Sequence, residues 1–243
     1  MNRQMKAIFF DFDGTLADDG DSISDGLTKA CEVVCRRWPE LNSRELTAAY
    51  RQVSDTAWGD YDQHLRHLSS PEAMLATVWN HTLGRWSLSD PTVEQEAAET
   101  YWQHRLRTCQ AYPDAMSVLQ QLAGRFQLSV LTNGAPAMQR AKLAATGIVP
   151  FFHHVFVGGE FARGKPAPAI FHAALAAAGC RPDQAVHIGD SLIHDVAGAR
   201  GVGIYSVWLN RKGLRSTTHI PDFEINTLEV LTECLERVTK ERK

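Results

Sequence analysis

The chain has 243 residues and a mass of 27.0 kDa, with 44% hydrophobic and 22% charged residues. This composition is that of a globular protein, and it excludes wholesale disorder, collagen-like repeats and a long coiled coil. The 25 basic and 28 acidic residues give a net charge of −3, without the basic surplus that nucleic-acid or anionic-membrane binding requires.

Short aliphatic segments typical of β-strands alternate with helical segments along much of the chain. Strands are predicted at residues 6–10, 127–131, 154–157, 185–188 and 204–208. Helices are predicted at residues 113–124, 138–146, 167–178, 193–201 and 228–238. This alternation predicts the α/β class, with a parallel sheet that helices cover on both faces.

A long insertion follows the first predicted strand. It reads almost entirely as helix, with segments at residues 24–38, 43–57, 71–82 and 92–109. We predict a helical cap domain at residues 16–112, and a Rossmann-like catalytic core at residues 1–15 and 113–243. Because an open parallel sheet binds ligands beyond the carboxyl ends of its strands, this insertion is expected to cover the ligand site.

The first polar motif, Asp11-Phe12-Asp13-Gly14-Thr15, begins where the first predicted strand ends. Two carboxylates two residues apart project to the same side of a strand, and Gly14 allows a sharp turn beside them. Such a pair can share a metal ion, or it can divide the nucleophile and acid/base roles. An Asx turn that closes a strand is the plain structural alternative.

Two further motifs follow later strands. Thr132-Asn133-Gly134 offers a hydroxyl and an amide just before a helix N-terminus, where free N–H groups favour an anion. Lys165 precedes Pro166 and Pro168, which stiffen the approach to a helix and could direct the lysine charge inward. Ordinary helix capping and a surface lysine would explain these two motifs singly.

The last polar motif runs from Gly189 to Asp195. Asp190 follows a predicted strand directly, and Ser191 and Asp195 lie at the start of the next helix. Either acid could be a helix cap. All four motifs, however, begin at the carboxyl ends of strands in one predicted sheet, so we expect their side chains to form one site.

Charge indicates what such a site binds. The carboxylates of Asp11, Asp13, Asp190 and Asp195 outweigh Lys165, so a hard divalent cation with oxygen ligands, Mg²⁺, is expected there. A phosphate dianion would make the site more negative again, so one carboxyl group should hold a proton. Asp13 is the candidate for that general acid, and Thr132 and Lys165 would hold the phosphoryl oxygens.

The four motifs in this order resemble those of the haloacid dehalogenase-like hydrolases, specifically phosphatases with a helical cap after the first strand. The resemblance implies a Rossmann-like sheet of order 5-4-1-2-3 and a phospho-aspartyl intermediate on Asp11. It implies that Asp13 protonates the leaving alcohol and then activates water, and that Asp190 binds Mg²⁺ with Asp11 and the backbone carbonyl of Asp13. Asp195 would support the metal or Lys165. Many relatives have Asn where His194 stands, which affects only the surrounding hydrogen bonds.

Several activities of this family remain open. Haloalkanoic-acid dehalogenases lack the second acid, so Asp13 argues against them, and a phosphonate-cleaving enzyme would need a cap lysine, for which only Lys29 is available. A phosphosugar mutase is harder to separate from a phosphatase. A non-catalytic phospho-ligand sensor is a further alternative, but the intact acid pair and lysine favour an enzyme. The expected substrate is a small phosphorylated metabolite, such as a phosphosugar, a nucleotide or flavin mononucleotide.

The remaining expectations concern the cap and the setting of the protein. Five of the six tryptophans lie in the predicted cap. They could form an aromatic platform that binds a flat ring, but the simpler alternative is that they pack the helices against one another. The apolar run at residues 7–10 is too short for a signal peptide or a membrane span. We therefore expect a cytoplasmic protein without a membrane partner. The charge balance predicts no nucleic-acid partner, and we expect a monomer or a homodimer.

Overall fold

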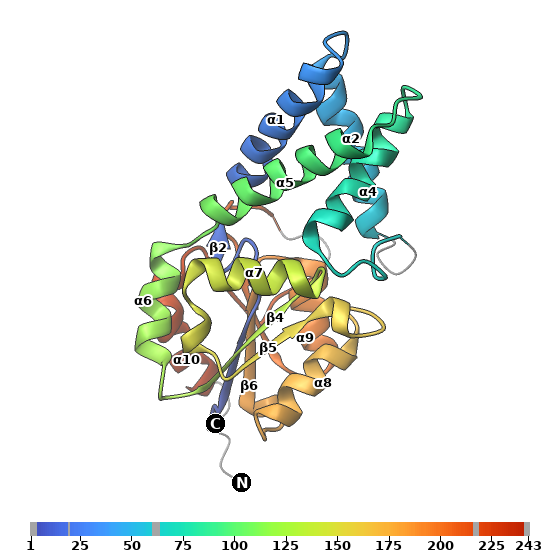
Figure 1. Cartoon of the computed structure of the whole chain (residues 1–243). Helices are drawn as coiled ribbons and strands as arrows, with labels where there is room; N and C mark the ends of the chain where they lie inside the picture. The colour runs from blue at the N-terminus through green and yellow to red at the C-terminus, as the bar shows by residue number, and fades with distance from the viewer. Residues whose placement is uncertain (1–3, 19, 60–63, 216–218, 241–243) are drawn as a thin grey trace. The chain divides into compact units, whose positions relative to one another are not determined.

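The computed structural model describes residues 4–18, 20–59, 64–215 and 219–240. Their mutual contacts divide them into two compact units. One unit holds the described residues of 1–18, 110–139 and 146–243, and the other holds those of 19–109 together with 140–145. The first unit contains the large sheet, and the second contains the helices labelled α1, α2, α4 and α5 (Figure 1).

The sheet has six strands, and every pairing between neighbours is parallel. The strands are β1 (Ala7–Phe10), β4 (Gln127–Thr132), β5 (His154–Val157), β6 (Ala185–Gly189), β7 (Tyr205–Leu209) and β8 (Phe223–Ile225). Their order is β5-β4-β1-β6-β7-β8. The α/β prediction is confirmed, and the five expected strands follow the implied order. The sequence did not predict β8, which extends the sheet at one edge.

Helices cover both faces of the sheet. Helices α6 (Pro113–Leu122) and α10 (Leu231–Lys240) lie on one side, and α8 (Pro168–Ala177) and α9 (Gly198–Gly201) lie on the other (Figure 1). Helix α7 (Pro136–Thr146) follows β4. The apolar core beneath α8 joins Phe9 and Leu131 of the sheet to Ile170 and Phe171. All four residues of β1 are buried, which explains its unbroken apolar sequence.

The segment after β6 differs from the continuous α-helix predicted at residues 193–201. A π-helix covers Leu192–Ala197, and α9 is confined to the four residues that follow. The carbonyl of Ser191 accepts the N–H groups of both Asp195 and Val196, and the second of these bonds spans five residues. This wider turn brings Asp195 close to the end of β6.

The second unit contains α1 (Gly20–Arg37), α2 (Ser43–Gly59), α4 (Pro71–Gly84) and α5 (Pro91–Thr108). Two of its tryptophans, Trp79 and Trp102, are buried, and the Tyr50 ring lies 4.5 Å from that of Trp79. These residues pack the helices, as the simpler alternative predicts. No helix in the described part of the chain is both long and apolar enough to cross a membrane.

The chain leaves and re-enters the sheet unit through a two-stranded antiparallel ribbon, β2 (Ala17–Asp18) and β3 (Gln110–Ala111). Strands of two residues leave no periodicity in a sequence, so neither was predicted. The assignment of residues 16–112 as a substrate-covering cap concerns their role, and it stays a prediction.

Candidate active site

The loop after β1 is tightly folded and carries the first motif. Asp11 donates its N–H to the carbonyl of Ile188, and the carbonyl of Phe12 accepts the N–H groups of residues 15, 16 and 17. Gly14 has a φ of +76°, and a Cβ atom there would lie 2.6 Å from Asp190 Oδ2. Glycine thus allows both the turn and its close approach to the Asp190 carboxylate.

Lys165 joins two of the predicted acids in a buried ion-pair network. Its Nζ donates to Asp11 Oδ1 at 2.7 Å and to Asp195 Oδ1 at 2.6 Å, and its side chain is only 2% exposed. Asp195 Oδ1 also lies 2.9 Å from His187 Nε2, while Oδ2 accepts the N–H of Ser191 at 3.0 Å. Because both oxygens of Asp195 are engaged, this residue is suited to position Lys165 rather than to bind a metal.

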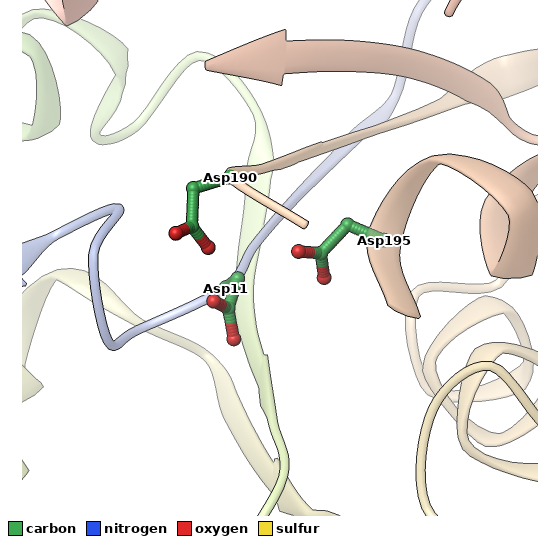
Figure 2. A group of neighbouring side chains, drawn as sticks. All are labelled: Asp11, Asp190 and Asp195. Atoms are coloured by element: carbon green, nitrogen blue, oxygen red, sulfur yellow. The ribbon is translucent and has the colours of Figure 1, made fainter. Parts of the chain in front are cut away.

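The carboxyl groups of Asp11, Asp190 and Asp195 gather at one place (Figure 2), and one oxygen from each lies within 4.8 Å of the others. Among the described residues, none donates a hydrogen bond to Asp11 Oδ2, and none outside Asp190 itself donates to the Asp190 carboxylate. Trp208 Nε1 fixes the Asp190 backbone by donating to its carbonyl at 2.9 Å. Oxygen atoms available on two adjacent carboxylates fit a hard divalent cation such as Mg²⁺.

Burial and charge shift the pKa values of these groups in opposite directions. Burial raises the pKa of Asp11, as do Asp195 and Asp190, while Lys165 opposes the shift. Burial and the charge of Asp195 raise the pKa of Asp190 to about 6. Burial alone would raise the pKa of Asp195, but Lys165 and His187 outweigh it and lower that pKa. One lysine therefore does not neutralise the three carboxylates, and a bound cation would relieve the excess charge.

This charge excess predicts that Mg²⁺ affinity depends on pH. Because a cation held by Asp11 and Asp190 would displace their protons, the dissociation constant for Mg²⁺ should rise as the pH falls. The dissociation constant should rise more steeply below about pH 6, where Asp190 takes up its proton. Each proton that the metal must displace changes the dissociation constant by about tenfold per pH unit. Titration calorimetry at several pH values checks this, with Asp190→Asn removing the lower step. An affinity independent of pH would contradict it.

Thr132 is the last residue of β4 and Asn133 follows it, and their side chains make different contacts. Thr132 is 1% exposed, and its Oγ1 donates to the carbonyl of Asn133 at 3.3 Å. The Asn133 side chain donates through Nδ2 to the Lys165 carbonyl and accepts the Lys165 N–H at Oδ1, both at 2.8 Å. Both polar atoms of the predicted substrate-binding residue Asn133 thus hold the backbone of Lys165.

Asp13 is not one of the three acids whose carboxyl oxygens gather within 4.8 Å of one another. It is half-buried, and its Oδ2 accepts a hydrogen bond from Gln139 Nε2 at 2.7 Å. Gln139, His187 and Trp208 were not identified from the sequence as members of the site. A histidine within the apolar strand β6 is a signal that could have been used, whereas Gln139 stands in no motif.

Comparisons with known proteins show the family of this chain. A family model for haloacid dehalogenase-like hydrolases matches residues 5–203. A phosphoserine phosphatase from Thermus thermophilus is 40% identical over 126 residues, which is 51% of this chain and 50% of that protein. A glyceraldehyde 3-phosphate phosphatase from Methanopyrus kandleri is 28% identical over 98% of this chain and 100% of its own length.

A solved structure of a 2-haloacid dehalogenase from Pseudomonas syringae pv. Tomato DC3000 shares the fold of this chain. It is 26% identical, has a TM-score of 0.74, and matches 96% of this chain and 99% of its own. The family model covers most of the chain, as the resemblance of the four motifs led us to expect. The protein therefore belongs to the haloacid dehalogenase-like hydrolases.

Proposed function

We propose that this enzyme hydrolyses small phosphomonoesters with Mg²⁺, through a phospho-aspartyl intermediate on Asp11. The observation that carries the proposal is the buried pairing of Asp11 with Lys165, next to a second acid, Asp13, on the same loop. The two named phosphatases above support this choice of substrate. Phosphoserine and glyceraldehyde 3-phosphate are both esters of primary alcohols, whose alkoxides leave poorly unless they are protonated.

The reaction proceeds in two steps on this chain's own residues. The Asp11 carboxylate forms a bond to phosphorus, the ester P–O bond breaks, and the departing alkoxide takes the proton of Asp13. Asp13 then accepts a proton from water, whose oxygen attacks phosphorus and breaks its bond to Asp11. The products are the alcohol and inorganic phosphate, and both acids return to their starting states.

The other residues hold charge in place. Lys165 favours the ionised form of Asp11 against the effect of burial, and we assign the Thr132 hydroxyl and the Lys165 ammonium to the phosphoryl oxygens. Asp11, Asp190 and the backbone carbonyl of Asp13 would hold Mg²⁺, which when bound offsets the charge of the phosphoryl group. Since the Asn133 side chain is engaged with Lys165, its contribution to substrate binding would come from its backbone N–H.

Dehalogenation is the competing activity, because a structural neighbour carries that name. Halide leaves as a stable anion and needs no proton, so Asp13 has no role in that reaction. A mutase would transfer the phosphoryl group to a second sugar hydroxyl, and a sensor would bind a phospho-ligand without turnover.

These activities are tested by incubating the purified protein with phosphoserine, glyceraldehyde 3-phosphate, p-nitrophenyl phosphate or 2-chloropropionate and measuring the release of phosphate and chloride. Release of inorganic phosphate from the esters is expected with Mg²⁺, and EDTA should lower it by about a hundredfold or more. No chloride should appear. Chloride release, phosphate release that EDTA leaves unchanged, or no turnover of any ester would contradict the proposal.

A further inference from the structure

Gln139 contacts the site without belonging to any of the four motifs. It is the fourth residue of α7 and is 6% exposed. Its Nε2 donates to Asp13 Oδ2 at 2.7 Å, and it also lies 3.1 Å from Thr132 Oγ1 and 2.5 Å from the Asn133 carbonyl oxygen. One amide nitrogen thus contacts both the proposed acid and a proposed phosphate ligand.

The chemistry of these partners fixes which end of the amide faces them. An ionised Asp13 carboxylate and the Asn133 carbonyl can only accept hydrogen bonds, and the Thr132 hydroxyl donates to that same carbonyl. The Gln139 nitrogen must therefore point toward Asp13. Gly134 leaves room for it, because a Cβ atom at that residue would lie 3.1 Å from Nε2.

The other end of the Gln139 amide argues against a packing role. Among the described residues, none donates a hydrogen bond to the buried Oε1 atom. Burying an unsatisfied carbonyl oxygen costs about 1–3 kcal/mol. An apolar side chain of the same size would fill this space without that cost, so the useful part of Gln139 is its N–H group.

We propose that Gln139 is a positioning residue that holds Asp13 Oδ2 as an acceptor, so that the proton given to the leaving group is carried by Oδ1. The inference rests on the phosphatase function proposed above. When Asp13 is protonated, a donor at Oδ2 favours the proton on the other oxygen. Gln139 thereby fixes both the rotamer of Asp13 and the oxygen that serves as the acid.

The consequence is a dependence on the leaving group. A primary alkoxide needs the proton of Asp13, whereas p-nitrophenolate departs without it. The ratio kcat/KM isolates formation of the phospho-enzyme, because hydrolysis of that intermediate comes after the alcohol has left. A misplaced Asp13 should therefore lower kcat/KM for phosphoserine far more than for p-nitrophenyl phosphate.

Gln139→Met removes the donor with little change in length, and Gln120→Met on the exposed face of α6 is the matched control. We expect Gln139→Met to lower kcat/KM for phosphoserine by about a hundredfold and that for p-nitrophenyl phosphate by less than about tenfold. Inhibition by inorganic phosphate should be unchanged, because phosphate binding does not use the Asp13 proton. The control variant should match the wild type on both esters.

Equal losses on both esters, no loss, or phosphate inhibition weakened in proportion to kcat/KM would overturn the inference. Gln139→Leu, which also lacks the N–H group and adds no charge, serves as a second variant if the methionine variant does not fold, and it should show the same selectivity. Wild-type turnover separates the two proposals. An inactive wild type refutes the phosphatase function, whereas an active wild type with unselective variants refutes only the role of Gln139.

Discussion

Asp11→Asn is expected to lower kcat for phosphate release by at least about four orders of magnitude. Asparagine keeps the shape of the side chain, but its neutral amide does not attack phosphorus. It also removes one of the two carboxylates that we propose as ligands of Mg²⁺. Steady-state phosphate release at saturating Mg²⁺ measures the loss, and Asp25→Asn on the exposed face of α1 serves as the control.

The same variant should keep the fold. In the metal-free protein, burial raises the pKa of Asp11, so the folded state favours the neutral carboxyl group over the ionised one. A permanently neutral amide should therefore leave the free energy of unfolding unchanged at low pH, and unchanged or higher at high pH. Denaturant unfolding in EDTA tests this.

The activity measurement has its own contradicting outcome. Turnover of Asp11→Asn within about tenfold of the wild type would contradict the assignment of Asp11 as the nucleophile.

Lys165→Met should both inactivate and destabilise the protein. The lysine is the cation that Asp11 and Asp195 share, and its side chain is 2% exposed. Removing one partner of a buried ion pair leaves uncompensated charge and costs about 3–5 kcal/mol. Lys29→Met, at an exposed residue of α1, changes the same functional group without this cost and is the matched control.

The destabilisation by Lys165→Met should depend on pH. Lys165 helps to lower the pKa of Asp195, so this carboxylate stabilises the wild type above its unfolded pKa of about 3.8 and loses that contribution only as the pH falls further. In the variant, the carboxyl groups of Asp11 and Asp195 become neutral by binding protons. The difference in unfolding free energy should therefore be largest at neutral pH and shrink toward pH 4. A difference independent of pH would show that the lysine acts by packing alone.

The polar motifs could be read from the sequence because parallel topology gathers the carboxyl ends of strands. Asp11 and Asp190 each follow a buried strand directly, and the register pairs Phe10 with Ile188. Residues separated by most of the chain are thus brought together by the sheet itself. Local pattern and topology were sufficient to identify these acids and to place them at one edge.

The remaining site contacts depend on three-dimensional packing that leaves no periodic signal. Gln139 reaches Asp13 only because α7 starts close to the end of β4, and a single glutamine in a helix is unremarkable in sequence. Trp208 reads as an ordinary apolar strand residue until its Nε1 contacts Asp190. The π-helix after β6 depends on the backbone contacts of Ser191, which no propensity scale encodes.

Reductive trapping tests the proposed chemistry at its first step. The wild-type enzyme is mixed with phosphoserine and Mg²⁺, quenched, and reduced with borohydride, which converts an aspartyl phosphate into homoserine. Peptide mass spectrometry should then find homoserine at residue 11 in the wild type and not in Asp11→Asn. Homoserine at another aspartate, or rapid phosphate release with no reducible residue during turnover, would show that Asp11 does not carry the phosphoryl group.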